Sequence, residues 1–545
     1  MWLRQRLRCN SLGFTLATAL FFTLCQNALF LQRAWSYITF DSVHSVIFAA
    51  SMPVVIFCAL NIIFSVLTVP YLRKPLIIFF LLGSAAANYF MFSYGVVIDG
   101  NMMQNAFETN PQEATALLTP RMGLWLALLG ILPAVAVCFT QIRQTRPWWY
   151  MVGLRAANVM LSLAVILIVA ALFYKDYASL IRNNKSVVKM LTPSNFVAGT
   201  IKFTEQRYFT RNLPLVKIGE DARKGPLIAG QAKKTLVILV VGETARAENF
   251  SLGGYQRETN PRLEQDNVVY FKNASSCGTE TAISVPCMFS NMPRKEYDAT
   301  QAAHQEGGLD VLAHAGVSVL WRDNDGGCKG ACDRVPHIDM TKLKLPQDCD
   351  GEVCMDNALL YKLNDYINGL KDDGVIVLHQ MGSHGPAYYR RSTPEFQTFL
   401  PTCNSNQIQD CSHEQLVNTY DNSILYTDAM LDATIKLLRQ YDGRFNTALV
   451  YLSDHGESLG ENGMYLHGTP YVFAPSQQTH VPFLMWMSAD YQRNFGIDRQ
   501  CLNALAEKGD VSQDNLFHTL LGMLNVQTRE YQSRLDILQR CRNAA

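Results

Sequence analysis

The sequence predicts a membrane protein in two parts, a multi-span α-helical domain followed by a three-layer α/β/α domain. The first 175 residues are strongly apolar and poor in charged side chains. From residue 235 onward, short apolar runs alternate with segments of helical periodicity, which is typical of a mostly parallel sheet with helices on both faces. The predicted strands are 235–242, 268–272, 317–321, 374–379, 446–452 and 481–487, and the predicted helices include 353–370 and 414–439. A chain of 545 residues is also long for a single domain. We therefore expect a transmembrane domain at 1–175, a bridge along the membrane surface at 176–230 and an α/β domain at 231–545.

Five segments near the N-terminus are long and apolar enough to cross a bilayer. Lys and Arg residues gather before the first segment, between the second and third, and between the fourth and fifth. The positive-inside rule then places the N-terminus in the cytoplasm, and five crossings place the α/β domain outside it. A net charge of only +1 argues against nucleic acid as a partner. The predicted spans are Leu12–Leu31, Val46–Val69, Leu76–Ile98, Met122–Ile142 and Ala156–Tyr174.

Side chains that suit zinc follow two of the predicted strands. Glu243 comes shortly after the apolar run 236–241, and Asp454 and His455 follow the run 447–453. Open α/β sheets bind their ligands outside the carboxyl ends of the strands, and carboxylate and imidazole groups are zinc ligands. Any one of the three residues alone fits a loop residue that caps a helix. The three together predict a metal site, because buried acids need a partner charge.

A turn rich in hydroxyl groups follows the predicted strand 268–271 and opens a short predicted helix that ends near Cys287. A hydroxyl group at a helix N-terminus lies beside free N–H groups and the positive end of the helix dipole, which suits a bound phosphate. Thr279, Thr281 and Ser284 are the candidate nucleophiles, and spacing alone does not choose among them.

Ten cysteines of the α/β domain fall mostly into near-neighbour pairs, which suits disulfides formed in an oxidising periplasm. None of these pairs has the C-x2-C spacing typical of zinc sites. Cys9, Cys25, Cys58 and Cys138 lie in or beside the spans, and we expect them to be free packing residues. Proximity predicts the first four bridges and elimination the fifth: Cys277–Cys287, Cys328–Cys332, Cys349–Cys354, Cys403–Cys411 and Cys501–Cys541.

Three motifs resemble those of the membrane phosphoethanolamine transferases of the alkaline-phosphatase superfamily. They are Gly-Glu-Thr-Ala-Arg at 242–246, Ser-Cys-Gly-Thr-Glu-Thr-Ala-Ile-Ser-Val-Pro-Cys at 276–287 and Ser-Asp-His-Gly-Glu-Ser at 453–458. The resemblance covers essentially the whole chain and is closest to the lipid A phosphoethanolamine transferases, which confer polymyxin resistance. It implies an alkaline-phosphatase/sulfatase-like fold, and one tightly bound zinc ion. The implied zinc ligands are Glu243, Thr281, Asp454 and His455.

The resemblance also implies a reaction. Thr281 takes phosphoethanolamine from phosphatidylethanolamine, releases diacylglycerol, and passes the group to a phosphate of lipid A. His384 and His467 match family positions, and we expect them to hold the donor phosphate or a second zinc. Lys329 is a candidate to neutralise a phosphoryl oxygen, whereas His379 is expected to be structural.

Other functions stay open at this point. The same fold supports transfer of phosphoethanolamine or phosphoglycerol to a lipopolysaccharide core sugar or a periplasmic glucan. A membrane scaffold with an inactive hydrolase domain is disfavoured, because every proposed ligand is present. We expect a monomer in a bacterial inner membrane with its catalytic domain in the periplasm.

The connection between the third and fourth spans contains polar residues at helical spacing. Asn105, Thr109 and Glu113 lie at i, i+4 and i+8, on one helix face if a helix continues past Pro111. Composition alone fits a solvated interfacial turn equally well. In the family resemblance these three positions hold the lipid substrate.

Overall fold

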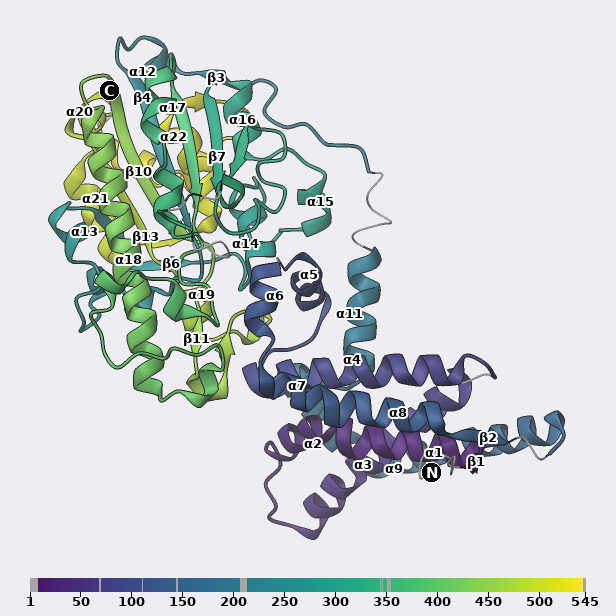
Figure 1. The fold of residues 1–545 in the computed structure, drawn as a ribbon. Coiled ribbons are helices and arrows are strands. Elements are labelled where there is room, and N and C mark those ends of the chain that lie inside the picture. The colour runs from purple at the N-terminus through teal and green to yellow at the C-terminus, as the bar shows by residue number, and fades with distance from the viewer. Residues whose placement is uncertain are drawn as a thin grey trace. The chain divides into compact units, whose positions relative to one another are not determined.

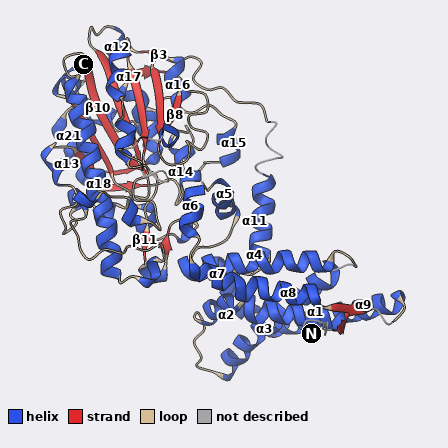
Figure 2. Cartoon of the chain, viewed as in Figure 1, coloured by secondary structure: helices blue, strands red, loops and turns tan. Residues whose placement is uncertain are grey.

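The computed structural model describes residues 8–67, 70–109, 111–143, 146–205, 213–343, 345, 347–349 and 354–542. The chain divides into two compact units. One consists of Met1–Phe107 and Leu118–Glu205, the other of Glu108–Leu117 and Gln206–Ala545. Figures 1 and 2 show that long helices dominate the first and that a sheet flanked by helices forms the second. We call them the helical unit and the α/β unit.

Four helices of the helical unit are long and apolar enough to cross a membrane: Val43–Leu67, Arg73–Tyr94, Pro120–Phe139 and Trp148–Ile181. They correspond to the last four predicted spans. The first predicted span is a helix pair, Ser11–Gln26 and Ala28–Trp35, bent by 54°, so the described residues contain five spans if the pair counts as one. The helices are α1 (Ser11–Phe21), α2 (Ala28–Trp35), α3 (Val43–Leu67), α4 (Arg73–Tyr94), α5 (Gly100–Glu108), α7 (Pro120–Leu126), α8 (Leu132–Phe139), α9 (Trp148–Asn183), α10 (Lys185–Val188) and α11 (Ser194–Thr204).

Two amide side chains lie at the bend of the first span, next to a π-helical turn at Phe22–Gln26. Asn27 donates through Nδ2 to the carbonyl oxygens of Phe22 and Thr192. Gln26 donates to the carbonyl of Leu129 and accepts from Asn88. Side-chain hydrogen bonds and π-helical turns both accommodate a break in a helix. The apolar composition of the segment did not predict this break.

A seven-stranded sheet with the order β5-β13-β10-β4-β9-β7-β8 forms the centre of the α/β unit. The strands from β10 to β8 run parallel, as predicted. β13 pairs antiparallel with β10 and with β5, so one edge of the sheet is antiparallel. All six predicted strands are present, and β8 is an addition. The strands are β4 (Lys234–Gly242), β5 (Val269–Phe271), β7 (Ser318–Asp323), β8 (His337–Asp339), β9 (Gly374–His379), β10 (Phe445–Ser453) and β13 (Phe483–Met487).

β4 lies in the middle of the sheet and is covered on both faces. Every residue from Leu236 to Val241 is fully buried, which explains why this strand is a continuous apolar run. Its alternate residues Val237, Leu239 and Val241 share one apolar cluster with residues of the helices α14, α16 and α22. The main helices of the unit are α13 (Pro261–Gln265), α14 (Thr281–Met288), α16 (Gly308–His314), α17 (Leu363–Gly369), α18 (His413–Gln440), α20 (Ala489–Asn494), α21 (Arg499–Lys508) and α22 (Leu516–Met523).

One predicted helix is shorter than expected. The stretch 353–370 contains a 3-10 turn at Asp356–Leu360 and then α17, which begins at Leu363. Lys362 between them has a φ of +51°, a left-handed conformation that interrupts a helix. The predicted helix at 414–439 is present as α18.

Five disulfides join the ten cysteines of the α/β unit. Cys277–Cys287 spans the turn before α14 and the helix itself, so it fixes the position of the helix N-terminus. The four cysteines of the helical unit are free. The remaining bridges are Cys328–Cys332, Cys349–Cys354, Cys403–Cys411 and Cys501–Cys541.

Candidate active site

The register of two central strands brings the first two site residues together. β4 and β10 are parallel neighbours with Gly242 opposite Ser453, so Glu243 and Asp454 leave the sheet side by side. The hydrogen bonding between the two strands extends one residue further, because the Asp454 N–H donates to the carbonyl of Gly242 at 2.9 Å. Asp454 Oδ1 accepts from the N–H groups of Thr244 and His455. The two carboxylates are fully buried at the carboxyl edge of the sheet.

Thr281 is the first residue of α14, and its hydroxyl group faces these side chains. Thr281 Oγ1 lies 3.1 Å from Glu243 Oε2 and 3.3 Å from His455 Nε2. His455 Nδ1 lies 2.9 Å from the carbonyl oxygen of Gly456. A carbonyl oxygen only accepts, so Nδ1 carries the proton and the lone pair of Nε2 faces Thr281.

The two competing hydroxyl groups make other contacts. Thr279 Oγ1 donates to the carbonyl of Thr469 at 2.7 Å. Ser284 Oγ accepts from the N–H of Gly278 at 3.0 Å, which stabilises the turn before α14. Of the three candidates, Thr281 is the one whose described contacts reach the carboxylate and imidazole groups. The structure thus distinguishes the three hydroxyl groups by their contacts, which spacing did not do.

Burial shifts the protonation of this group. Burial raises the pKa of Glu243 to about 7, and the nearby Asp454 carboxylate adds to that rise. Burial also raises the pKa of Asp454. Burial, together with the neighbouring His467, lowers the pKa of His455 to about 4. Each shift favours the uncharged form, which is the response of a buried cluster that lacks a compensating cation.

These residues fit a zinc-type ion. Ligand atoms of Glu243, Asp454 and His455 all lie within 4.8 Å of one another. Asp454 Oδ2 is buried and has no hydrogen-bond partner among the described residues, so one carboxylate oxygen is available to a metal. The Gly456 carbonyl fixes the His455 tautomer, as outer partners of metal-bound histidines do. Two carboxylates and an imidazole, with the Thr281 hydroxyl beside them, form a suitable donor set for zinc.

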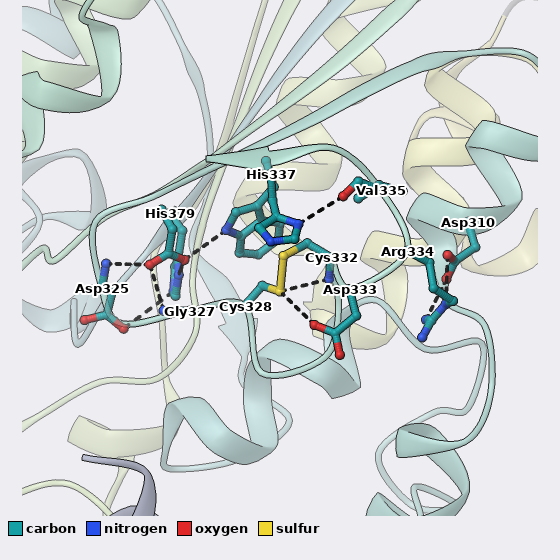
Figure 3. The surroundings of a disulfide bond; sticks show 12 residues. Asp310, Asp325, Gly327, Cys328, Cys332, Asp333, Arg334, Val335, His337 and His379 are labelled. Atoms are coloured by element: carbon teal, nitrogen blue, oxygen red, sulfur yellow. Dashed lines mark hydrogen bonds and ion pairs between the residues drawn. A yellow bond between two sulfur atoms is a disulfide. The ribbon is translucent and has the colours of Figure 1, made fainter. Parts of the chain in front are cut away.

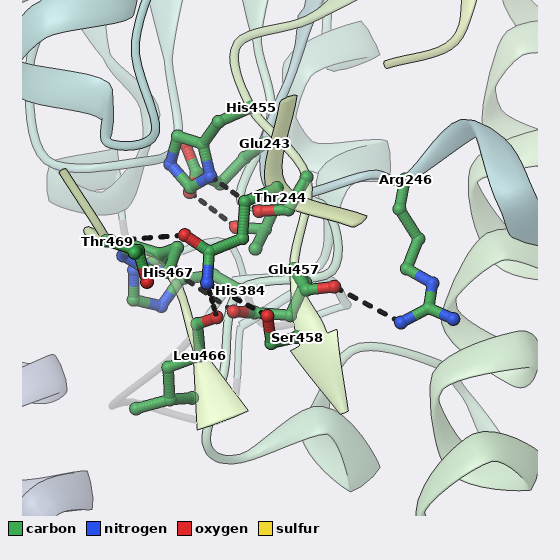
Figure 4. A network of polar contacts seen from close by, with 12 residues as sticks. Glu243, Thr244, Arg246, His384, His455, Glu457, Ser458, Leu466, His467 and Thr469 are labelled. Carbon is green, nitrogen blue, oxygen red and sulfur yellow. Dashed lines mark hydrogen bonds and ion pairs between the residues drawn. The ribbon is translucent and has the colours of Figure 1, made fainter. Parts of the chain in front are cut away.

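Two further histidines adjoin this group (Figure 4). The ring centroids of His455 and His467 are 4.4 Å apart, and those of His384 and His467 are 5.3 Å apart. His467 Nδ1 lies 3.4 Å from the Glu457 carboxylate. Burial alone would lower the pKa of His467, but Glu457 outweighs it and raises that pKa to about 9. His467 is therefore cationic at neutral pH and suits a bound phosphate.

Glu457 is a site residue that the sequence reasoning missed. It is fully buried, and Arg246 Nη1 donates to its backbone oxygen at 3.2 Å, which anchors the segment that carries it (Figure 4). Its position in the motif at 453–458 was the available signal.

Two other residues singled out in the sequence, Lys329 and His379, have no described contact with Thr281. Lys329 is half-buried in the loop closed by Cys328–Cys332, with a φ of +50°. His379 is at the end of β9, and its Nδ1 lies 2.9 Å from Asp323 Oδ2.

The single helix that would align Asn105, Thr109 and Glu113 does not form. α5 ends at Glu108, and α6 (Pro111–Leu117) begins at the proline. Proline lacks an N–H and its ring clashes with the preceding turn, so it begins a helix more readily than it continues one. Asn105 is in α5 and Thr109 lies between the two helices. The side chain of Glu113 lies outside the described residues.

Two protein-family models match this chain and indicate its class. The family model "Sulfatase" matches residues 235–526, and the model "Phosphoethanolamine transferase EptA/EptB" matches residues 56–208. The fold and the site thus define a membrane enzyme of the alkaline-phosphatase/sulfatase superfamily.

Individual relatives narrow this class. Phosphoethanolamine transferase EptA of Escherichia coli K12 is 52% identical over 544 residues, covering 100% of this chain and 99% of that protein. Phosphatidylethanolamine transferase Mcr-1 of Escherichia coli is 35% identical and covers 96% of each chain. The structure of the integral membrane protein lipooligosaccharide phosphoethanolamine transferase A from Neisseria meningitidis matches with a TM-score of 0.95 and 40% identity, covering 99% of this chain and 100% of that one. The chain belongs to the EptA family of phosphoethanolamine transferases.

Proposed function

We propose that this enzyme moves phosphoethanolamine from phosphatidylethanolamine to a phosphate of lipid A through a phospho-threonine on Thr281. The observation that carries the proposal is the convergence of Thr281 Oγ1 with Glu243 and His455, at 3.1 Å and 3.3 Å. A threonine hydroxyl is a weak nucleophile until a neighbouring base or metal activates it. Names of relatives support the substrates, since Mcr-1 is called a phosphatidylethanolamine transferase.

In the first half-reaction Thr281 Oγ1 attacks the donor phosphorus, and the bond from phosphorus to the diacylglycerol oxygen breaks. The Thr281 proton is drawn toward Glu243 Oε2, to which the hydroxyl donates. Zinc bound by Glu243, Asp454 and His455 would lower the pKa of the hydroxyl and offset charge on the phosphoryl oxygens. His467, cationic beside Glu457, holds a phosphoryl oxygen and supplies a proton to the departing diacylglycerol.

In the second half-reaction a lipid A phosphate oxygen attacks the same phosphorus. The bond to Thr281 Oγ1 breaks, and the threonine takes back the proton held by Glu243 Oε2. The proton that the attacking lipid A phosphate loses restores the proton that His467 gave to diacylglycerol. His384 lies beside His467 and is placed to hold the donor or acceptor phosphate. Lys329 and the residues Asn105, Thr109 and Glu113 remain candidates for contacts with the lipid substrates.

Variants of the hydroxyl residues test the nucleophile. Thr281→Ala should lower transfer by roughly 10³-fold or more, while zinc stays bound because three protein ligands still form a workable site. Thr281→Ser should keep part of the activity. Thr279→Ala is the matched control, since its hydroxyl bonds to Thr469. Trapping the covalent adduct by peptide mass spectrometry locates the modified residue, and an adduct on Thr279 would reassign the nucleophile.

The acceptor is tested separately. Mild acid hydrolysis separates lipid A from the core, and mass spectrometry of each fraction from cells with and without the enzyme shows where phosphoethanolamine is added. We expect it on lipid A, with weaker binding of polymyxin, because the ammonium group offsets a phosphate charge. Phosphoethanolamine in the core fraction or on a periplasmic glucan would instead favour the alternative acceptors.

We also propose that the protein lies in the bacterial inner membrane with its α/β unit in the periplasm. The positive charges around the spans support this topology, and five disulfides suit an oxidising compartment. A reporter that is active only outside the cytoplasm, fused after residue 545, should be active. Activity of a cytoplasm-specific reporter at the same position would contradict the topology.

A further inference from the structure

A second group of ligand-type side chains adjoins the proposed zinc site. Ligand atoms of Glu243, Asp325 and His379 lie within 4.8 Å of one another, and all three residues are buried. The sheet brings them together, because β9 lies between β4 and β7. His379 is opposite Val241 on one side and opposite Asp323 on the other. Glu243 belongs to both groups, whereas Asp325 and His379 have no part in the proposed reaction.

His379 is oriented as metal-bound histidines are. Its Nδ1 lies 2.9 Å from Asp323 Oδ2, and the Trp321 indole and the Gly327 N–H hold the Asp323 carboxylate in place (Figure 3). This carboxylate–histidine pairing fixes the ring and directs Nε2 away from Asp323. Nε2 is completely buried and has no hydrogen-bond partner among the described residues.

The distance between His379 and Asp325 shows whether they are spaced as a hydrogen-bonded pair or as two ligands of one metal ion. His379 Nε2 lies 3.7 Å from Asp325 Oδ2, which is too long for a hydrogen bond. Zinc–nitrogen and zinc–oxygen bonds of about 2.0–2.2 Å at a tetrahedral angle separate two ligands by roughly 3.3–3.6 Å. The observed spacing is therefore closer to that of two ligands of one ion than to that of an imidazolium donating directly to a carboxylate.

The negative charge of the buried carboxylates around His379 also favours a bound cation. Glu243, Asp323 and Asp325 are 0%, 5% and 4% exposed. Burying ionised carboxylates is costly unless a partner charge is present. A protonated His379 would add one positive charge, beside Asp323. A divalent cation between Glu243 and Asp325 would compensate the others while leaving His379 neutral at Nε2.

We propose that Glu243, Asp325 and His379 form a second divalent-cation site that shares the Glu243 carboxylate with the first. Two carboxylates and one imidazole suit zinc. The site would hold Glu243 in place from the side opposite Asp454, with Asp323 acting as the outer partner of His379. This inference goes beyond the transfer reaction. Its tests measure the number and the positions of bound metal ions and need no activity assay.

Zinc stoichiometry is the first test. The full-length protein in detergent is stripped of metal, titrated with Zn²⁺, passed through a desalting column and measured by inductively coupled plasma mass spectrometry. We expect two equivalents for the wild type and one for Asp325→Asn and for His379→Gln. Asp428→Asn is the matched control, a fully buried carboxylate that caps α13, and should keep two equivalents. One equivalent in the wild type, or two in Asp325→Asn, overturns the proposal.

The second test locates the ions without any variant. Crystals of the wild type grown with Zn²⁺ are measured on both sides of the zinc absorption edge. We expect one anomalous peak at Glu243, Asp454 and His455 and another within about 2.0–2.2 Å of His379 Nε2. A peak at the first position with none at the second refutes the further inference and leaves the proposed function standing. A peak only at the second position refutes the first zinc site instead.

Discussion

The two units of the molecule bury polar side chains in different ways. In the helical unit the buried amides bond to each other and to backbone carbonyls, as Gln26, Asn27 and Asn88 do. In the α/β unit the polar groups at the strand ends are mostly ionisable, and Asp454 Oδ2 and His379 Nε2 are left without hydrogen-bond partners among the described residues. A buried polar group without a partner costs free energy. The amides of the first unit are satisfied by neighbouring groups, whereas these two atoms at the strand ends have ligand-type chemistry and no protein partner among the described residues.

Removing a site carboxylate should have the largest effect on activity. Asp454→Asn should lower transfer by roughly 10³-fold or more, since zinc binding fails with it. The metal-free variant should be as stable as the metal-free wild type or more so, because an uncompensated buried charge is gone. Zinc analysis and thermal unfolding with and without EDTA measure both effects. A metal-free variant that unfolds well below the metal-free wild type would show that Asp454 serves the fold.

A smaller loss of activity is expected when Glu457, which contacts His467, is changed. Glu457→Gln preserves the shape of the side chain but removes the charge that orients His467, so kcat should fall by roughly 10–100-fold, with zinc retained. Glu264→Gln is the control, because Glu264 is exposed on α13, and it should change kcat by less than about twofold. Steady-state kinetics in detergent micelles with a phosphatidylethanolamine analogue provide the readout. An unchanged kcat in Glu457→Gln would remove Glu457 from the site.

His518 tests whether a buried ionisable group outside the site behaves like the amides of the helical unit. Its Nδ1 accepts from the Gln532 N–H at 3.2 Å, and burial, with Arg534 nearby, lowers its pKa to about 4. The folded state therefore favours neutral His518, so its stabilising contribution is present above the ordinary histidine pKa and is lost as the pH falls toward 4. Between pH 7.5 and 4.5 this loss amounts to about 2–3 kcal/mol.

Urea unfolding at several pH values measures this effect in the wild type. His518→Gln has no titratable ring, so its stability should fall less over the same pH range. Equal pH dependence in both proteins would exclude His518 as the source.

The smallest effect is expected on stability, when a buried amide of the helical unit is replaced. Asn88→Leu removes two donated hydrogen bonds to Gln26 and should destabilise the protein by about 0.6–2 kcal/mol, while zinc binding and transfer remain. Leu167→Ala, at a position that is 60% exposed on α9, is the control for a change outside the buried amides. Unfolding in mixed detergent micelles gives both values. A loss of activity in Asn88→Leu without a loss of stability would give the amides a functional role.

Local patterns in the sequence predicted much of the fold. Continuous apolar runs identified the strands around Glu243 and Asp454, because a central strand covered on both faces has no polar side. Length and hydropathy identified the spans, because a bilayer demands a minimum apolar length. Proximity predicted four of the cysteine pairs and elimination the fifth, and the structure contains all five.

Some features of the fold depend on distant parts of the chain and did not follow from local patterns. The bend at Gln26 and Asn27 depends on partners such as Leu129 and Thr192, which are distant in the chain. The antiparallel edge at β13 depends on strand order, and a single strand carries no mark of its neighbours' direction. The shared helix face of Asn105, Thr109 and Glu113 was conditional on a helix that continues past Pro111, and Pro111 instead begins α6.

The sequence by itself determined the two-part organisation, the strands and the chemical character of the residues at their ends, since each of these follows from local composition. Only the tertiary structure decided which hydroxyl faces the metal-ligand group and that Glu457 supports His467. It also decided that Asp325 and His379 adjoin Glu243. The grouping of Glu243 with Asp454, Asp325 and His379 depends on the register β10-β4-β9-β7, which places residues from four distant segments within a few ångströms. Contacts of that kind are set by packing across the sheet, and no local pattern encodes them.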